Sequence, residues 1–182
     1  MHNEWITYLQ GQQANINEQG RLSFASDSEE ARTVSEASVI ADLSPLGIIR
    51  VSGEEATDFL QGQFSNDIQQ LDGQTAQLSS YCNPKGRILA SFWIYRHNDA
   101  FYMLLPAGTL AATLKRLRMY VLMSKVTLED ASEELVCIGL AGPDSEQALQ
   151  QQLEAVPTEA RNTRSEERRV GTECRSRWSS YH

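Results

Sequence analysis

Hydrophobic residues recur between positions 43 and 156 with two periods, one typical of strands and the other of helices. Residues 46–51 form a short β-branched run that stops at Ser52-Gly53, which predicts a buried strand. Alternating or short apolar runs predict five further strands, over residues 74–83, 87–95, 100–105, 125–128 and 135–140. Asn83-Pro84-Lys85-Gly86 and the turn after His97 join three of these strands tightly, which predicts an antiparallel meander.

Helical spacing appears between these strands. Ser52 and Glu55 have the spacing of a capping box, so we expect a helix to start there and to end at Gly62. A second helix follows Pro106, with an apolar side made by Leu110, Leu114, Leu117 and Val121. Further short helices are expected around Trp5 and from Gly142 to Pro157. The order of elements predicts an α+β fold, with a mixed, largely antiparallel sheet and packed helices. We find no internal repeat and no Gly-rich phosphate loop.

Four segments of different character divide the chain. Residues 1–42 are polar and weakly patterned, so they are interpreted as an N-terminal extension in which Ser26-Asp27-Ser28-Glu29-Glu30 is a turn or solvated surface. Residues 43–157 form the predicted domain, and 158–163 a truncated linker. Residues 164–182 have no apolar periodicity and resemble the conceptual translation of a sequencing adapter, so we expect an artefactual tail. A disordered charged C-terminus is the alternative.

Charge and composition narrow the classes of function. The chain has a net charge of −8, and its last 19 residues carry five Arg and three Glu, so residues 1–163 carry −10. Such acidity argues against direct non-specific binding of nucleic acid. No apolar run reaches the roughly 18 residues of a membrane span, and the N-terminus lacks the pattern of a secretory signal. Three separated cysteines indicate neither a disulfide framework nor a metal site, so we expect a cytoplasmic protein.

Six segments resemble the YgfZ/GcvT superfamily in their order and spacing. They are residues 49–56, 59–63, 66–68, 82–88, 120–126 and 140–143. The resemblance spans about residues 43–150 and implies the α+β folate-binding N-terminal domain of that superfamily. Its members include the glycine-cleavage T-proteins, which transfer a one-carbon unit with tetrahydrofolate. They also include YgfZ proteins, folate-binding proteins linked to iron–sulfur enzyme maturation and tRNA modification.

Departures from the superfamily patterns separate these branches. T-proteins commonly place an acidic pair in the strand after the Gly-containing turn, and the matching positions here are Ala90 and Ser91. Neither side chain can act as a carboxylate base. The resemblance therefore favours the YgfZ branch, and we assign no catalytic residue. The Lys-Gly-Cys-x-x-Gly-Gln-Glu motif that YgfZ proteins carry in their second half does not occur in this sequence.

The resemblance implies tetrahydrofolate or another folate as the ligand. Asn66 and Asp67 would contact the pterin or line the central cleft, and Leu46 stands near a position where some members place a tryptophan close to folate. Lys85 and Arg87 would bind a glutamate carboxylate. A stacking wall would come from Tyr81 and Trp93, together with Phe92 and Tyr95.

Each of these residues also has a structural interpretation. Asn and Asp cap turns, charges beside a hairpin turn are commonly solvated, and aromatic residues in strands are commonly core. Cys82 and Cys137 are interpreted as inert small hydrophobes, and His97 as an exposed turn residue. A basic surface for a tRNA or a protein partner, or simply a solvated helix face, would be made by Lys115, Arg116, Arg118 and Lys125.

The resulting prediction is a folate-binding protein that is not an enzyme by itself. Through bound tetrahydrofolate it would support iron–sulfur enzymes, including those that modify tRNA. One alternative is a folate-dependent aminomethyltransferase, against which Ala90 and Ser91 argue. The other is a protein-interaction module whose folate site has decayed, with which Leu46 is compatible.

Overall fold

A computed structural model describes residues 3–18 and 22–152, so the predicted linker and tail lie outside the described residues. The described chain divides into two compact units. One, the sheet unit, is Gly47–Ala131. The other, the split unit, is built from the described residues up to Leu46 together with the described residues 132–152.

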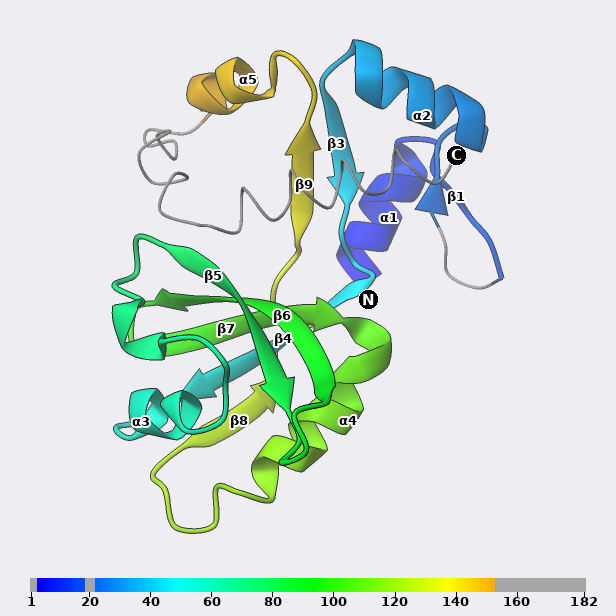
Figure 1. The fold of residues 1–182 in the computed structure, drawn as a ribbon. Helices are drawn as coiled ribbons and strands as arrows, with labels where there is room; N and C mark the ends of the chain where they lie inside the picture. The colour runs from blue at the N-terminus through cyan, green and yellow to red at the C-terminus, as the bar shows by residue number, and fades with distance from the viewer. Residues whose placement is uncertain (1–2, 19–21, 153–182) are drawn as a thin grey trace. The chain divides into compact units, whose positions relative to one another are not determined.

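The sheet unit contains a five-stranded sheet in the order β5-β6-β7-β4-β8 (Figure 1). Its strands are β4 (Leu46–Ser52), β5 (Ala76–Cys82), β6 (Ile88–His97), β7 (Ala100–Pro106) and β8 (Thr127–Asp130). β5, β6 and β7 pair antiparallel with their neighbours in the chain, and β4 pairs antiparallel with β8. The predicted α+β class and the meander are therefore confirmed.

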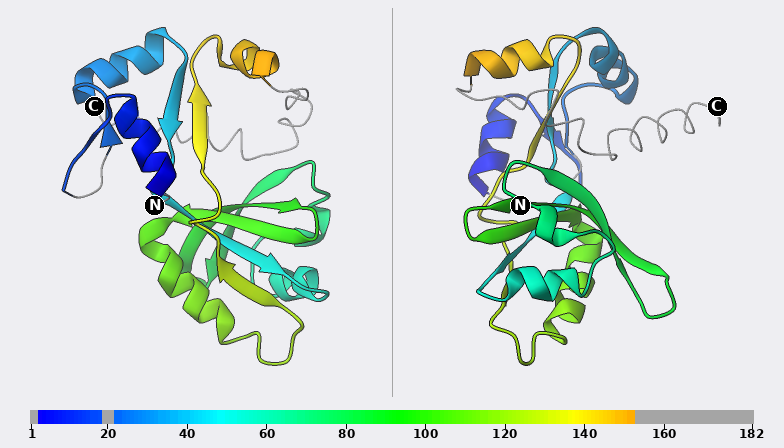
Figure 2. Two further views of the ribbon diagram at one scale, coloured as in Figure 1. Left: turned by 180° about the vertical axis from the view of Figure 1, so that it is seen from behind. Right: turned by 60° about the vertical axis from the view of Figure 1, so that its left-hand side comes forward.

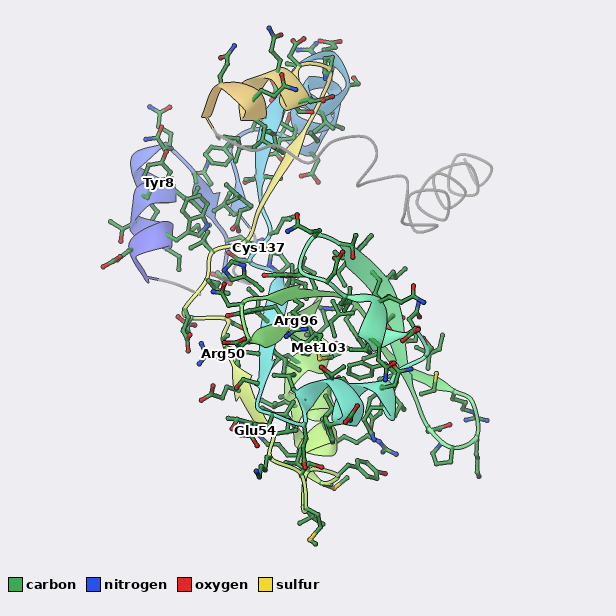
Figure 3. All side chains as sticks on the ribbon, turned by 90° about the vertical axis from the view of Figure 1, so that its left-hand side faces the viewer. Tyr8, Arg50, Glu54, Arg96, Met103 and Cys137 are labelled. Carbon is green, nitrogen blue, oxygen red and sulfur yellow. The ribbon has the colours of Figure 1, made fainter. Side chains whose placement is uncertain are left out.

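Helices cover one face of this sheet, and the hydrophobic core lies between the helices and the sheet. The helices are α3 (Ala56–Gln61), the 3-10 turn η1 (Ile68–Gln70) and α4 (Ala107–Arg118). Residues on this face of the strands, including Phe92 and Met103, form one buried cluster with Leu60 and Leu117 of the helices. Figure 3 shows Met103 inside the sheet unit, whereas Glu54 lies at its surface. On β6 the buried residues Ala90, Phe92 and Ile94 alternate with exposed ones, so the sheet has a covered face and an open face.

The split unit joins segments that lie about a hundred residues apart. From its N-terminal segment come α1 (Asn3–Gly11), β1 (Asn15–Ile16), β2 (Leu22–Ser23), α2 (Asp27–Glu36) and β3 (Val39–Asp42), and from its second segment come β9 (Ile138–Ala141) and α5 (Ser145–Gln152). β3 pairs antiparallel with β9. The boundary that we placed between residues 42 and 43 therefore differs from the division in the structure.

Two expectations about helix starts differ from the structure. Ser26–Glu30 lies at the surface, as one of the two interpretations held, but it opens α2 and does not form a turn, because Ser26 and Glu29 make a reciprocal capping box. The predicted capping box of Ser52 and Glu55 does not form. Glu55 is the N-cap residue of α3 without a capping bond, and its carboxylate accepts a 2.8 Å bond from the Lys125 amide.

Each unit contains one strand–glycine–helix connection of the same kind. Gly53 (φ +122°) joins β4 to α3, and Gly142 (φ +112°) joins β9 to α5. A Cβ on Gly53 would lie 2.1 Å from the Lys125 carbonyl oxygen, and one on Gly142 would lie 2.3 Å from that of Ala37. Lys125 lies two residues before β8, which pairs with β4, and Ala37 lies two residues before β3, which pairs with β9. This repetition was not predicted, because it lies in the backbone conformation and not in a repeated sequence.

Candidate functional site

The two faces of the sheet separate the aromatic residues that we predicted to form one stacking wall. Tyr81 and Phe92 are 3% and 1% exposed and belong to the core. Trp93 is 42% exposed and lies on the open face, where Tyr95 is half-buried. A wall made of all four residues is therefore not present, because neighbouring positions along a strand point to opposite faces. Burial raises the pKa of Tyr81, and the neighbouring Arg116 guanidinium partly opposes that shift.

Cross-strand pairs build an apolar surface around Trp93, which we call the open-face patch. Its members are Leu78, Ser91, Trp93, Tyr95, Tyr102 and Leu104. Trp93 stands opposite Leu78 on one side and Leu104 on the other. Tyr95 and Tyr102 are cross-strand partners whose rings stack at 5.4 Å with 14° between their planes. Rings fixed in this way present flat apolar area with little loss of conformational entropy on binding.

Ala90 and Ser91 differ in which face they occupy. Ala90 is buried in the core, whereas Ser91 is exposed on the open face. Only Ser91 can therefore meet a ligand that lies against Trp93. A serine hydroxyl does not ionise at neutral pH, so this position supplies no general base.

Asn66 and Asp67 are exposed in the connection between α3 and η1. The Asp67 carboxylate accepts from the Gln69 amide at 3.1 Å and from the Gln70 side chain at 3.0 Å, which caps η1. The Asn66 side-chain oxygen accepts from the Ser65 hydroxyl at 2.9 Å. These bonds correspond to the structural interpretation of both residues.

Lys85 and Arg87 lie in the turn of the β5–β6 hairpin. The Asn83 side-chain oxygen accepts from both of their backbone amides, at 2.9 and 3.0 Å, and Gly86 takes φ +75°. This turn extends beyond the rest of the sheet unit (Figure 2). Both side chains are exposed. Leu46 is half-buried at the start of β4 and falls in the split unit.

Sequence reasoning missed Tyr102, Leu78 and Leu104. The tight turn pairs His97 with Ala100. Counting from that pair back along β6 and forward along β7 places Tyr95 opposite Tyr102 and Trp93 opposite Leu104. That count was possible from the turn signal alone. Within the described residues, no group of three or more His, Cys, Asp or Glu side chains is placed to hold a metal ion, and no helix is long and apolar enough to cross a bilayer.

Comparison with known families decides the assignment. Residues 5–172 match the model of the GCVT N-terminal domain. The chain belongs to this family. The match includes residues 164–172 of the segment that we expected to be artefactual, and that segment lies outside the described residues.

Relatives of two names match the chain. It is 31% identical over 118 residues to the tRNA-modifying protein YgfZ of Colwellia psychrerythraea, covering 65% of this chain and 36% of that protein. It is 35% identical over 130 residues to the aminomethyltransferase of Thermus thermophilus, and the match covers 71% of this chain and 37% of that protein. The chain thus spans little more than a third of the length of these relatives.

A solved structure shares the fold. The glycine cleavage system aminomethyltransferase T from Bartonella henselae superposes with a TM-score of 0.67 at 19% identity. The superposition covers 80% of this chain and 42% of that chain. It confirms the GcvT-type fold that the resemblance implied.

Proposed function

We propose that this domain binds a folate, with the flat pteridine ring stacked on the open-face patch at Trp93. The observation that carries the proposal is the uncovered Trp93 ring, flanked by Leu78 and Leu104. Stacking on an aromatic side chain uses the π-face that a pteridine shares with other heteroaromatic rings. Membership of the GCVT N-terminal domain family supports a folate in place of another flat ligand.

Lys85 and Arg87 are the proposed donors for the acidic tail of the ligand. Their side chains are exposed at the end of the strand that carries Trp93. Tyr81 is not part of the proposed site, because its ring lies on the covered face, and Asp67 is not part of it, because that carboxylate caps η1.

The proposed role of the bound folate is to support iron–sulfur enzymes that modify tRNA. The similarity to a protein named tRNA-modifying protein YgfZ supports this role, as does the absence of a carboxylate at Ala90 and Ser91. In a host that lacks the gene, we expect less of the tRNA modifications made by iron–sulfur enzymes, measured by nucleoside mass spectrometry. The wild-type gene should restore them and a Trp93→Leu gene should not.

Folate-dependent aminomethyl transfer is the second candidate, which the 35% identity to an aminomethyltransferase favours. Transfer of a one-carbon unit to tetrahydrofolate by the purified protein would favour aminomethyl transfer over the support of iron–sulfur enzymes. An interaction module with a decayed folate site predicts no folate binding at all.

Calorimetric titration of the full chain with tetrahydrofolate tests the proposal. We expect saturable binding that Trp93→Leu abolishes and Trp93→Phe retains in part, since phenylalanine keeps a ring. Tyr81→Phe is the matched control, because it changes an aromatic residue on the opposite face and should leave the affinity unchanged. Equal affinities of the wild type and Trp93→Leu would overturn the proposed site.

A further inference from the structure

The connection between α4 and β8 exposes large apolar side chains, and we call it the apolar loop (residues 119–124). Leu122 is 86% exposed and Met123 is 97% exposed, while Met119 at the start of the loop is 54% exposed. Figure 1 shows this loop projecting beyond α4 and β8. Met103, by contrast, is 0% exposed in the core. The thioether of Met123 is therefore open to any small reagent in the solvent.

Contacts that do not involve the Met123 side chain hold the apolar loop in place. The Ser124 amide donates to the Val121 carbonyl oxygen at 2.8 Å, and the Val121 side chain packs against the core. Where the loop ends, the Lys125 amide donates to the Glu55 carboxylate at 2.8 Å. A chemical change at the Met123 sulfur therefore leaves these supports of the loop intact.

The chemistry open to an exposed thioether is oxidation by a peroxide. The sulfur attacks one peroxide oxygen, a sulfur–oxygen bond forms and the oxygen–oxygen bond breaks. The sulfur is oxidised to the sulfoxide, and hydrogen peroxide is reduced to water. Methionine sulfoxide is polar, and reductases return it to the thioether. At Met103 the new oxygen would be buried at a cost in free energy, whereas at Met123 it would stay in water.

We propose that Met123 is a site of reversible oxidation by peroxides, with Met119 as a slower second site. Oxidation changes the tip of the apolar loop, Leu122 and Met123, from an apolar surface to a polar one while the fold stays intact. The site is separate from the proposed folate site, whose open-face patch lies on β5, β6 and β7.

Peptide mass spectrometry of the full chain, treated with hydrogen peroxide and stopped with catalase at increasing times, tests the site. We expect the sulfoxide to form first at Met123 and more slowly at Met119. Met103 should react more slowly than Met123 by on the order of tenfold or more, because it is reached only when the core opens. Methionine sulfoxide reductases should return Met123 to the thioether, with the circular dichroism spectrum unchanged throughout. Oxidation of Met123 no faster than that of Met103, or loss of the folded spectrum with Met123 alone oxidised, would overturn the proposal.

Hydrophobic-interaction chromatography measures the change of the surface, at a treatment time when Met123 is oxidised and Met119 is not. Oxidation should shorten the retention of the wild type, and the reductases should restore it. Met123→Gln should elute early without peroxide, because its side chain is polar. Met123→Leu is the matched control, since it stays apolar and cannot form a sulfoxide, so peroxide should leave its retention unchanged. Equal shortening in the wild type and Met123→Leu would contradict the proposal. The folate proposal fails separately, because Trp93→Leu should leave the oxidation of Met123 unchanged.

Discussion

Replacing Gly53 by alanine is expected to destabilise the sheet unit strongly. Its φ of +122° lies in a region that residues with a Cβ rarely adopt. The new Cβ would lie 2.1 Å from the Lys125 carbonyl oxygen and 3.1 Å from the Val126 Cα, and real Cβ contacts are essentially never under 3.0 Å. Both neighbours are backbone, so no rotamer change can relieve the contact.

The magnitude follows from two contributions. The backbone conformation costs about 1–3 kcal/mol for a residue with a Cβ. Moving the Lys125 carbonyl by roughly 1 Å also disturbs the pairing of Ser52 with Thr127, which costs about 1 kcal/mol per hydrogen bond lost. We therefore expect Gly53→Ala to lower the free energy of unfolding by about 2–4 kcal/mol.

Urea unfolding followed by circular dichroism measures this change, with two glycines as controls. Gly86 has φ +75° and open space around it, so Gly86→Ala should cost only about 1–2 kcal/mol. Gly108 lies in α4 with no neighbour within 4 Å, so alanine there should be neutral or stabilising. A Gly53→Ala protein as stable as Gly108→Ala would refute the reasoning.

Three further changes test other parts of the structure. Ser79→Ala should be neutral or stabilising in urea unfolding, because the buried Ser79 hydroxyl has no hydrogen-bond partner. Ser26→Ala should speed amide exchange in α2, whose capping box it removes. Hydrogen bonds from Ser26 lower the pKa of Glu29 below its ordinary value of 4.5. The cap should therefore stabilise α2 fully above pH 4.5 and lose that effect as the pH falls through the pKa of Glu29 in the folded protein. A carboxyl titration by nuclear magnetic resonance measures this dependence. Lys125→Ala should change the free energy of unfolding by less than about 0.5 kcal/mol, because its ion pair with Glu54 is largely exposed at both ends.

Local signals sufficed for most of the sheet unit. Turn chemistry at Asn83–Gly86 and alternation on both sides of it defined the hairpin, and the spacing of Leu110, Leu114 and Leu117 defined the buried side of α4. The pairing of β3 with β9 could not be predicted, because it depends on contacts between segments about a hundred residues apart. The buried face of β5 carries Ser79 and Tyr81. Both side chains have a polar atom, so a search for hydrophobic positions does not identify them as buried.

The candidate site was predicted only in part. Trp93 and Tyr95 were identified as aromatic, but the face of the sheet that helices cover decides which aromatics stay accessible. Phe92 and Tyr81 could not be separated from Trp93 by residue type. Asp67 shows the opposite problem, since a carboxylate suited to a ligand is used to cap η1.

The central claim is that a folate lies on the open face of the sheet, and mapping amide shifts on titration with tetrahydrofolate tests it most directly. We expect saturable shifts centred on Leu78, Ser91 and Trp93 and smaller shifts in α3 and α4 on the covered side. Shifts centred on α4, or no saturable shift anywhere in the sheet unit, would contradict the account.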